Sequence, residues 1–372
     1  MKQEPNSFRA ILLMAAIGSY LLWSAGAAIP LLRLDLEISR TLAGLHNVAV
    51  GISATLGARL AVPLIKKFGR EYVMRAMLLV MFIGVMALVT APTIAITIPA
   101  VGIAAFSQTI VNAISLAQIS HDKAPSMQRM MLQTGIQAVV GASAILIISA
   151  SLHSGNGWRL PIIIGALVLT PISLFSIWRV KFIAPESTHQ HSTAVFTRKI
   201  QARLVIFGAV NSILEVGVGF WALDLLVSRD APVALGALGS AILSFGIATG
   251  RLSLAYLQLN PLHVMRFATT AIITGVTIIC LFDDPIITMG GLTIAALGIS
   301  PLFGLGAFRV SEGFPHADFR ISRYMMGTSF SYGFAPFILA IVFDTAGYVV
   351  GYAALIPVAI TGFVLWKING KE

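Results

Sequence analysis

The chain has 372 residues, of which 57% are apolar and only 11% are charged. Soluble domains average about 45–50% apolar and about 25% charged residues, so this composition excludes a soluble enzyme, a secreted module and a disordered protein. The net charge of +10 does not indicate a nucleic-acid partner, because the cytoplasmic loops of membrane proteins collect Lys and Arg. The single cysteine, Cys280, excludes a disulfide framework and a multi-cysteine metal site. We therefore expect a polytopic membrane protein.

Apolar runs of about 20 residues, the length that crosses the hydrocarbon core as a helix, recur along the whole sequence. They predict twelve membrane-spanning helices, at residues 8–32, 41–65, 72–91, 93–119, 131–153, 158–180, 202–228, 233–257, 265–282, 285–308, 324–343 and 348–366. Several connectors are only three or four residues long, as at 154–157 and 283–285. Successive helices must then pack as antiparallel neighbours in the lipid bilayer.

The longest polar stretch, residues 181–201, divides the predicted spans six and six. We expect residues 1–180 to form an N-terminal six-helix half, residues 181–201 a cytoplasmic linker, and residues 202–372 a C-terminal half. The linker carries His189 and His191, which could hold a metal but which we interpret as solvated loop residues. No metal site and no cofactor are expected.

The basic residues predict the orientation in the membrane. Lys and Arg concentrate in the connectors on the same side of the membrane as the N-terminus, for example between Lys66 and Arg75. Four arginines fall on the opposite side, namely Arg33, Arg40, Arg159 and Arg229. This positive-inside pattern predicts a cell-membrane protein with both termini in the cytoplasm.

Short matches between the two parts of the chain predict an internal repeat. They pair Ser39-Arg40 with Ser228-Arg229, Arg59-Leu60 with Arg251-Leu252, Val73-Met-Arg75 with Val264-Met-Arg266, and Met130-Met131 with Met325-Met326. The matches occur in order and at a nearly constant offset, as a duplication would produce, and transporters use duplication to build two halves around a central site. The predicted fold class is an all-α membrane protein with twelve transmembrane helices in two pseudo-symmetric six-helix halves.

The loop after the second predicted span, residues 62–70, reads Val-Pro-Leu-Ile-Lys-Lys-Phe-Gly-Arg. With the twelve spans and the repeat, it resembles the major facilitator superfamily, whose corresponding loop reads Gly-x-x-x-Asp-Arg-x-Gly-Arg. Lys67, Gly69 and Arg70 fit this pattern, whereas Lys66 replaces the acidic residue. A looser resemblance, to the cyanate-permease-like branch, involves this loop and the one after the fourth span. The resemblance implies a secondary transporter whose first, fourth, fifth, seventh and eleventh spans line a cavity.

Ionisable side chains inside membrane helices are rare and costly, so each is a candidate functional residue. Glu215 lies at the centre of the seventh span, about 20 Å from either end at 1.5 Å per residue. Burial favours the protonated form of a carboxyl group, so we predict that Glu215 carries a proton; a structural, hydrogen-bonded glutamate is the alternative. Asn211 shares its helix face and is a predicted substrate contact. Asp224, nearer the outer end, is either a second proton-coupling residue or an interfacial one.

Arg59 and Arg251 occupy repeat-related positions in the second and eighth spans. Two arginines from opposite halves could hold an anion between them, because each guanidinium offers planar paired donors. Alternatively, both side chains could extend to the cytoplasmic headgroups. If both arginines face the cleft, we expect a small anionic substrate.

Neutral polar residues occur in pairs with helical spacing, which places each pair on one helix face. The predicted cavity-lining residues of this kind are Tyr20 and Trp23, Gln108 and Asn112, Gln133 and Gln137, and Tyr332, which follows Ser329 by three residues. A single amide in a membrane helix often only holds helices together. Paired ones on five spans favour a water-filled cleft.

We predict a monomeric secondary transporter that moves a small solute by alternating access, is coupled to protons and favours a small anion. The alternatives are a proton-driven exporter of cationic or amphipathic compounds and a non-transporting membrane sensor, which the loss of the acidic residue at Lys66 would favour. No G-x-x-x-x-G-K-[ST] or H-E-x-x-H motif is present in the sequence. We therefore expect neither an ATP-driven pump nor an enzyme. The expected partners are the substrate, protons and the lipid bilayer.

Overall fold

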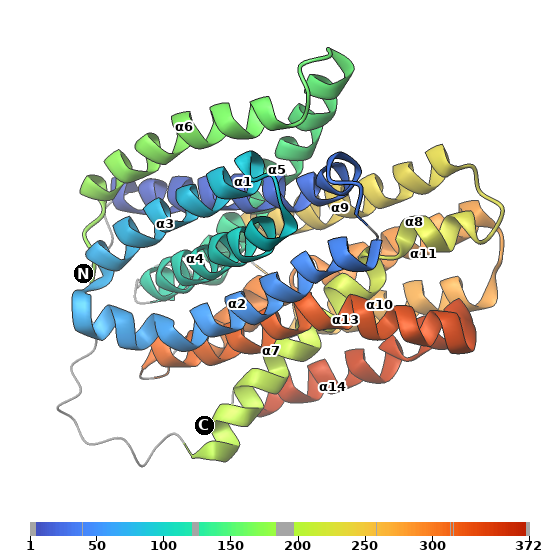
Figure 1. Ribbon diagram of the computed structural model, residues 1–372. Coiled ribbons are helices and arrows are strands. Elements are labelled where there is room, and N and C mark those ends of the chain that lie inside the picture. The colour runs from blue at the N-terminus through green and yellow to red at the C-terminus, as the bar shows by residue number, and fades with distance from the viewer. Residues whose placement is uncertain are drawn as a thin grey trace.

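The computed structural model describes residues 5–38, 40–120, 126–183, 197–257, 259–312, 314 and 316–369. Within these ranges every regular element is a helix (Figure 1). The first part of the chain forms α1 (Pro5–Asp35), α2 (Arg40–Phe68), α3 (Arg70–Thr90), α4 (Ile94–Ser120), α5 (Ser126–His153), α6 (Arg159–Ser176) and the short η1 (Ile177–Arg179). The second part forms α7 (Arg198–Gly219), α8 (Ala222–Val227), α9 (Val233–Tyr256), α10 (Pro261–Leu281), α11 (Pro285–Ile299), α12 (Leu302–Ser311), α13 (Ala317–Ala353) and α14 (Leu355–Ile368).

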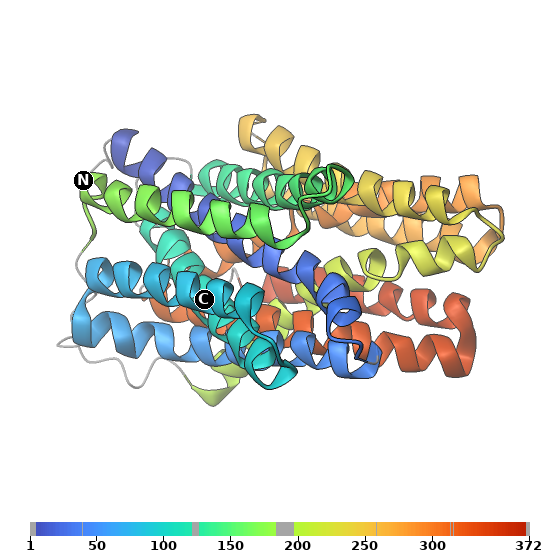
Figure 2. The ribbon, with the colours of Figure 1, turned by 45° about the horizontal axis from the view of Figure 1, so that its top comes forward.

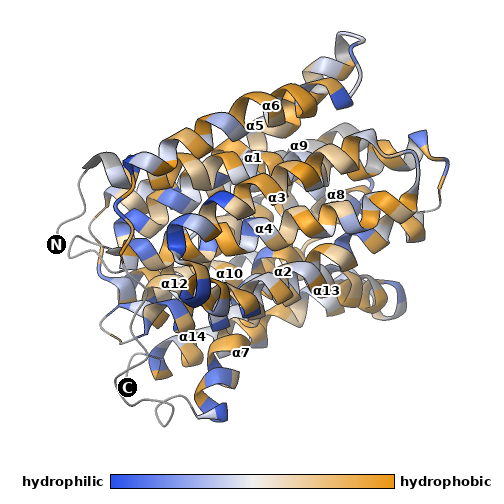
Figure 3. Ribbon diagram, turned by 60° about the vertical axis from the view of Figure 1, so that its left-hand side comes forward, coloured by the Kyte–Doolittle hydropathy of each residue, from blue (hydrophilic) through white to orange (hydrophobic). Residues whose placement is uncertain are grey.

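The length and composition of these helices suit a membrane. Among the described residues, nine helices are long and apolar enough to cross a bilayer, and the bent α13 would add a tenth. Figure 3 shows hydrophobic residues along most of the helix surface, with hydrophilic residues more frequent toward the helix ends near the two termini. The all-α membrane fold class is thus confirmed, and the count of twelve spans stays a prediction that this fold accommodates.

Three predicted spans differ from straight helices. The seventh is divided into α7 and α8, and the tenth into α11 and α12. The second break coincides with Pro301, which has no backbone N–H to donate within a helix. In α13 the segments Ala317–Leu339 and Ile341–Ala353 lie at 89° to each other. Within the second segment the helix is also interrupted at Gly347, whose φ of 83° glycine adopts without steric cost. Gly347 lies at the connector expected between spans eleven and twelve, so that connector is a kink within α13.

The short connectors follow from their turn chemistry. Asp284 caps α11, because its side chain accepts hydrogen bonds from the backbone N–H groups of Ile286 and Ile287. Asn260 caps α10 in the same way. Each cap is followed by a proline at the first helical position, which needs no hydrogen-bond partner there. Successive helices can therefore reverse direction within a few residues.

Two helix pairs make the most extensive contacts between the first six spans and the last six. α2 packs against α13 and α5 packs against α9, and these pairs lie alongside each other in Figures 1 and 2. The predicted repeat relates α2 to α9 and α5 to the first part of α13. The contact of α2 with α13 therefore corresponds to the contact of α9 with α5. This is the pattern that two repeated halves would give. The division at residues 181–201 stays a prediction, and residues 184–196, with His189 and His191, lie outside the described residues.

Candidate functional site

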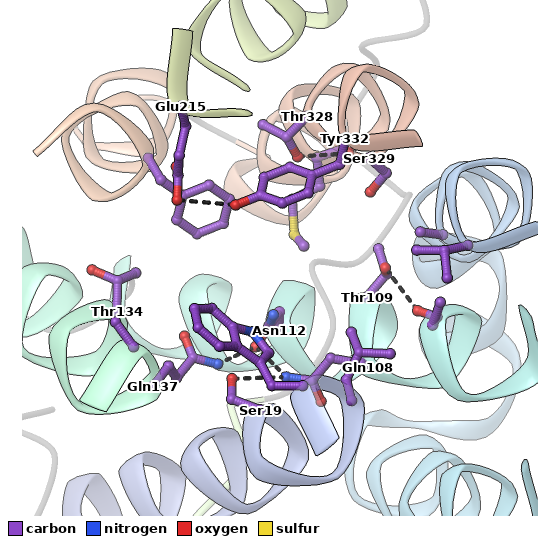
Figure 4. Close-up of a pocket in the computed structure, with 18 of the residues that line it drawn as sticks. Ser19, Gln108, Thr109, Asn112, Thr134, Gln137, Glu215, Thr328, Ser329 and Tyr332 are labelled. Carbon is purple, nitrogen blue, oxygen red and sulfur yellow. Dashed lines mark hydrogen bonds between the residues drawn. The ribbon is translucent and has the colours of Figure 1, made fainter. Parts of the chain in front are cut away.

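A cavity of about 180 Å³ lies between α1, α4 and α5 on one side and α7, α9, α12 and α13 on the other. Figure 4 shows polar side chains from the two sides facing each other across it. One wall carries Glu215, Thr328, Ser329 and Tyr332, and the other carries Ser19, Gln108, Asn112 and Gln137. Trp23, Thr109, Thr134 and Arg251 also line the cavity, and Val50 and Ala54 of α2 border it.

An ion pair occupies the first wall. Arg251 on α9 donates from Nη2 to Oε1 of Glu215 on α7 over 2.9 Å. The Tyr332 hydroxyl on α13 donates to the same carboxylate oxygen over 3.0 Å. Arg251 also donates from Nε to the Ser300 carbonyl over 2.9 Å, which fixes the plane of its guanidinium. Because the two charged side chains are only 8% and 12% exposed, the pair is held in a setting where breaking it is costly.

An amide cluster forms the facing wall, which we call the amide wall: Ser19, Gln108, Asn112 and Gln137. Asn112 Oδ1 accepts a hydrogen bond from Gln137 Nε2 over 2.7 Å and another from Gln108 Nε2 over 3.4 Å. Gln108 Nε2 also lies 3.4 Å from the Ser19 hydroxyl. The buried Gln108 Oε1 has no partner within the described residues. The amide wall is therefore neutral and retains hydrogen-bonding capacity.

Glycines allow the side chains of this wall to pack. A Cβ on Gly18 would lie 2.0 Å from Gln108 Oε1, and a Cβ on Gly141 would lie 2.5 Å from Trp23 Cδ2. Any larger residue at either position would displace the amide or the indole from its place. Local sequence on α1 and α5 thus sets the shape of the cavity.

A second buried ion pair closes the bundle at the end that carries the termini. Arg70 at the start of α3 pairs with Asp318 at the start of α13. The Arg70 side chain has no exposed surface, and it also donates to Gln118 Oε1 over 3.3 Å. Gln118 in turn donates to the Lys181 carbonyl, and the Ser322 hydroxyl of α13 donates to the Ala58 carbonyl of α2. The contacts of α13 with α3 and α2 link the two groups of helices at this end of the bundle.

Asp318 supplies the carboxylate that the loop at residues 62–70 lacks. Lys66, which stands at the acidic position of the loop pattern, is exposed, whereas Arg70 of the same loop is buried against Asp318. Sequence reasoning missed Asp318, because a carboxylate in the predicted connector at residues 309–323 gives the same signal as an ordinary solvated residue.

The predicted site residues divide into two groups. Those that line the cavity together are Trp23, Gln108, Asn112, Gln137, Glu215, Arg251 and Tyr332. Those that do not line it are Tyr20, Arg59, Gln133, Asn211 and Asp224. The roles of both groups stay predictions.

Each residue of the second group lies in a definite place. The Tyr20 ring packs on Gly165 of α6, and Asn211 donates to the Tyr324 hydroxyl and to the Leu302 carbonyl. Gln133 is 1% exposed, and its amide atoms have no partner in the described part of the chain. Arg59 is exposed and within electrostatic range of Arg323. Asp224 is exposed on α8. Arg59 and Arg251 therefore do not meet in one cleft here.

Four further polar residues line the cavity without having been predicted as site residues: Ser19, Thr109, Thr134 and Thr328. Ser19 precedes Trp23 by four residues, so helical spacing could have indicated it. The three threonines donate to backbone carbonyls one turn back. Most membrane-helix threonines do the same, so their sequence positions carry no such signal.

An all-α bundle of apolar helices around a polar, ion-paired cavity defines a membrane transport protein, in which a small molecule enters between two groups of helices. The chain belongs to the Major Facilitator Superfamily, whose family model matches residues 11–318. The predicted resemblance is thus confirmed at the level of the superfamily. No curated protein matches the sequence.

Solved structures share the fold at low identity. The E. coli transporter FucP in its outward conformation matches with a TM-score of 0.77 and 13% identity, covering 98% of this chain and 99% of that one. The proton:xylose symporter XylE matches with a TM-score of 0.78, 14% identity and coverages of 98% and 96%. The human organic anion transporter MFSD10 matches with a TM-score of 0.79 and 14% identity, covering 98% of this chain and 100% of that one. The protein is accordingly a multi-pass membrane transporter and not an enzyme.

Proposed function

We propose that the protein is a proton-coupled secondary transporter that moves a small monovalent anion by alternating access. The observation that carries the proposal is the ion pair of Arg251 with Glu215 at the wall of the cavity. Among the residues that line this cavity, these two are the charged ones, so with both ionised the lining is neutral.

Protonation of Glu215 changes this balance. The carboxyl group loses its negative charge, and the guanidinium of Arg251 is left without a counter-ion in a poorly solvated place. An unpaired buried charge costs about 3–5 kcal/mol. An anion that takes the place of the carboxylate, on Arg251 and the Tyr332 hydroxyl, removes this cost. Proton and anion therefore load together, and the loaded cavity is again neutral.

This mechanism replaces the expectation that Arg59 and Arg251 hold the anion between them. Arg59 does not line the cavity, so a second permanent cation is not available there. The positive charge that attracts the anion arises instead when Glu215 takes up a proton. An exporter of cations would rely on Glu215 and Asp224. Asp224 does not line the cavity, and Glu215 is already paired with Arg251, so the lining offers a cation less than it offers an anion.

The direction of access rests on the closed end of the bundle. If the termini are cytoplasmic, as the basic residues predict, the Arg70–Asp318 pair seals the cytoplasmic side and the substrate enters from outside the cell membrane. The likeness to FucP in its outward conformation supports this assignment. Two other proteins of similar fold are a proton:xylose symporter and an organic anion transporter, which is in keeping with proton coupling and with an anionic substrate.

Flux into proteoliposomes under an imposed pH gradient tests the proposal. A panel of small monocarboxylates and inorganic anions is compared with lipophilic cations, with empty liposomes as the control. We expect accumulation of at least one anion that collapses when a protonophore removes the gradient. Accumulation of cations alone, or of no solute at all, would overturn the proposal.

A further inference from the structure

We infer that the anion is a small hydroxylated monocarboxylate, whose carboxylate binds at Arg251 and Tyr332 and whose hydroxyl groups bind the amide wall. This inference rests on the proposed function, since it names the class of anion that the same cavity accepts. It is carried by the chemistry of the wall that faces the ion pair.

The charge of the cavity limits the substrate to one carboxylate. Once Glu215 is protonated, Arg251 is the single charge among the lining residues. A second carboxylate on the substrate would meet no cation within reach and would have to be desolvated without compensation. A monovalent anion leaves the loaded cavity neutral, whereas a dianion does not.

The amide wall sets the character of the rest of the molecule. Amide and hydroxyl side chains each offer both donors and acceptors, and a sugar-type hydroxyl group needs both. Gln108 Oε1 is buried without a partner, and Asn112 uses its oxygen rather than its nitrogen in the hydrogen bonds to Gln108 and Gln137. An apolar tail placed against this wall would leave these groups unsatisfied, which is costly.

Size and shape agree with a small, compact solute. The cavity of about 180 Å³ is smaller than the roughly 300–1,000 Å³ of most ligand pockets. Trp23 borders it and packs closely against Gly141, so the indole forms part of its apolar surface. An aromatic surface beside hydrogen-bonding groups suits a molecule with both C–H and O–H faces.

Binding to the purified Glu215→Gln protein, measured by titration calorimetry in lipid nanodiscs, tests the inference separately from proton coupling. The probes are D-gluconate, the shorter L-threonate, neutral D-glucose, apolar hexanoate and the dicarboxylate D-glucarate. We expect gluconate or threonate to bind at least tenfold more tightly than glucose, hexanoate and glucarate. Equal binding of hexanoate would overturn the role of the hydroxyl groups, and equal binding of glucarate would overturn the limit to one carboxylate.

Substitutions in the amide wall provide a second measurement. Asn112→Ala and Gln137→Ala should each weaken gluconate binding by roughly tenfold, the effect of one or two lost hydrogen bonds, and should leave residual hexanoate binding unchanged. Retained hexanoate binding shows that the variants fold. Asn156→Ala, in the exposed loop before α6, is the matched control. If hexanoate is accumulated with protons and gluconate is not, the proposed transport stands and this inference fails; if no anion binds, both fail.

Discussion

The Glu215 carboxylate accepts hydrogen bonds from two donors on different helices, the Arg251 guanidinium and the Tyr332 hydroxyl. α7, α9 and α13 are thereby joined through one oxygen atom. A proton on Glu215 weakens its attraction to both donors at once. A single protonation can therefore change the charge of the cavity and the contacts between three helices together.

The first prediction concerns this proton. Glu215→Gln mimics the protonated carboxyl group permanently, so the anion should bind without a proton. We expect gradient-driven accumulation to be lost while substrate exchange across the proteoliposome membrane stays measurable. Glu71→Gln, at an exposed pair with Arg75 on α3, serves as the control and should accumulate substrate normally. Normal accumulation by Glu215→Gln would show that the proton is carried elsewhere.

The second prediction separates the two repeat-related arginines. Arg251 donates from two different nitrogens, to Glu215 and to Ser300, and a lysine ammonium cannot reproduce this planar arrangement. Arg251→Lys should therefore weaken substrate affinity by roughly tenfold or more, as expected for a lost charged hydrogen bond. Arg59→Lys should change it less than about twofold, because an exposed lysine stem reaches water equally well. Concentration-dependent uptake measures both, and equal losses would restore the model of two clamping arginines.

Sequence alone indicated part of the cavity lining, but it did not indicate which side chains pair with one another. Helical spacing places Gln108 beside Asn112 on one face, and the structure brings both to the cavity. The partner of Glu215 was not predictable, because periodicity does not show which face of α9 meets α7. The repeat was misleading for Arg59. At its offset of about 192 residues, the counterpart of Glu215 falls between Tyr20 and Ser24, where no acidic residue occurs, so the first half offers Arg59 no equivalent partner.

At the scale of helices, close approach of α2 and α13 depends on two glycines. A Cβ on Gly51 would lie 2.7 Å from the Cα of Gly333, and a Cβ on Gly333 would lie 2.5 Å from the Cα of Gly51. Backbone atoms cannot move aside as a flexible side chain can. Small residues at such a crossing let membrane helices pack through backbone contact.

The third prediction follows from this crossing. Gly51→Ala should separate α2 from α13 and lower stability by about 1–3 kcal/mol, the usual cost of overpacking. Gly44→Ala in the same helix, where a Cβ would meet no atom within 4 Å, is the control and should be neutral or slightly stabilising, because alanine favours a helix over glycine. Thermal unfolding of the purified proteins in detergent gives the comparison. Equal melting temperatures for Gly51→Ala and the wild type would show that the crossing is looser than described.

The apolar runs predicted where most helices lie along the chain. They did not predict where those helices break or bend. The break at Pro301 and the bend of α13 fall inside or between apolar stretches, where hydropathy does not change. Helix breaks of this kind depend on local backbone geometry and on which neighbouring side chains satisfy the freed groups. A hydropathy pattern contains neither.

At the scale of the whole molecule, the cavity and the closed end are separate features that a transport cycle must couple. The Glu215–Arg251 pair lies at the cavity, and the Arg70–Asp318 pair lies at the end that carries the termini. In the proposed cycle, the second pair breaks when the first has exchanged its carboxylate for substrate. The sensor alternative was favoured by the missing acidic residue at Lys66. It is weakened by Asp318, which provides a carboxylate for the same loop.

The fourth prediction tests this closed end. Asp318→Asn leaves Arg70 buried without a counter-ion, which favours conformations in which that end opens to water. With Cys280 replaced by serine, a single Ser329→Cys at the cavity reports access to a membrane-impermeant maleimide from each side of oriented vesicles. We expect Asp318→Asn to increase labelling from the side of the termini and to decrease it from the other side. The charge-reversed double variant, Arg70→Glu with Asp318→Arg, should restore the original labelling, whereas Glu71→Gln at the exposed neighbouring pair should not alter it. Labelling unchanged on both sides in Asp318→Asn would mean that this pair stabilises the fold without controlling which side of the membrane the cavity faces.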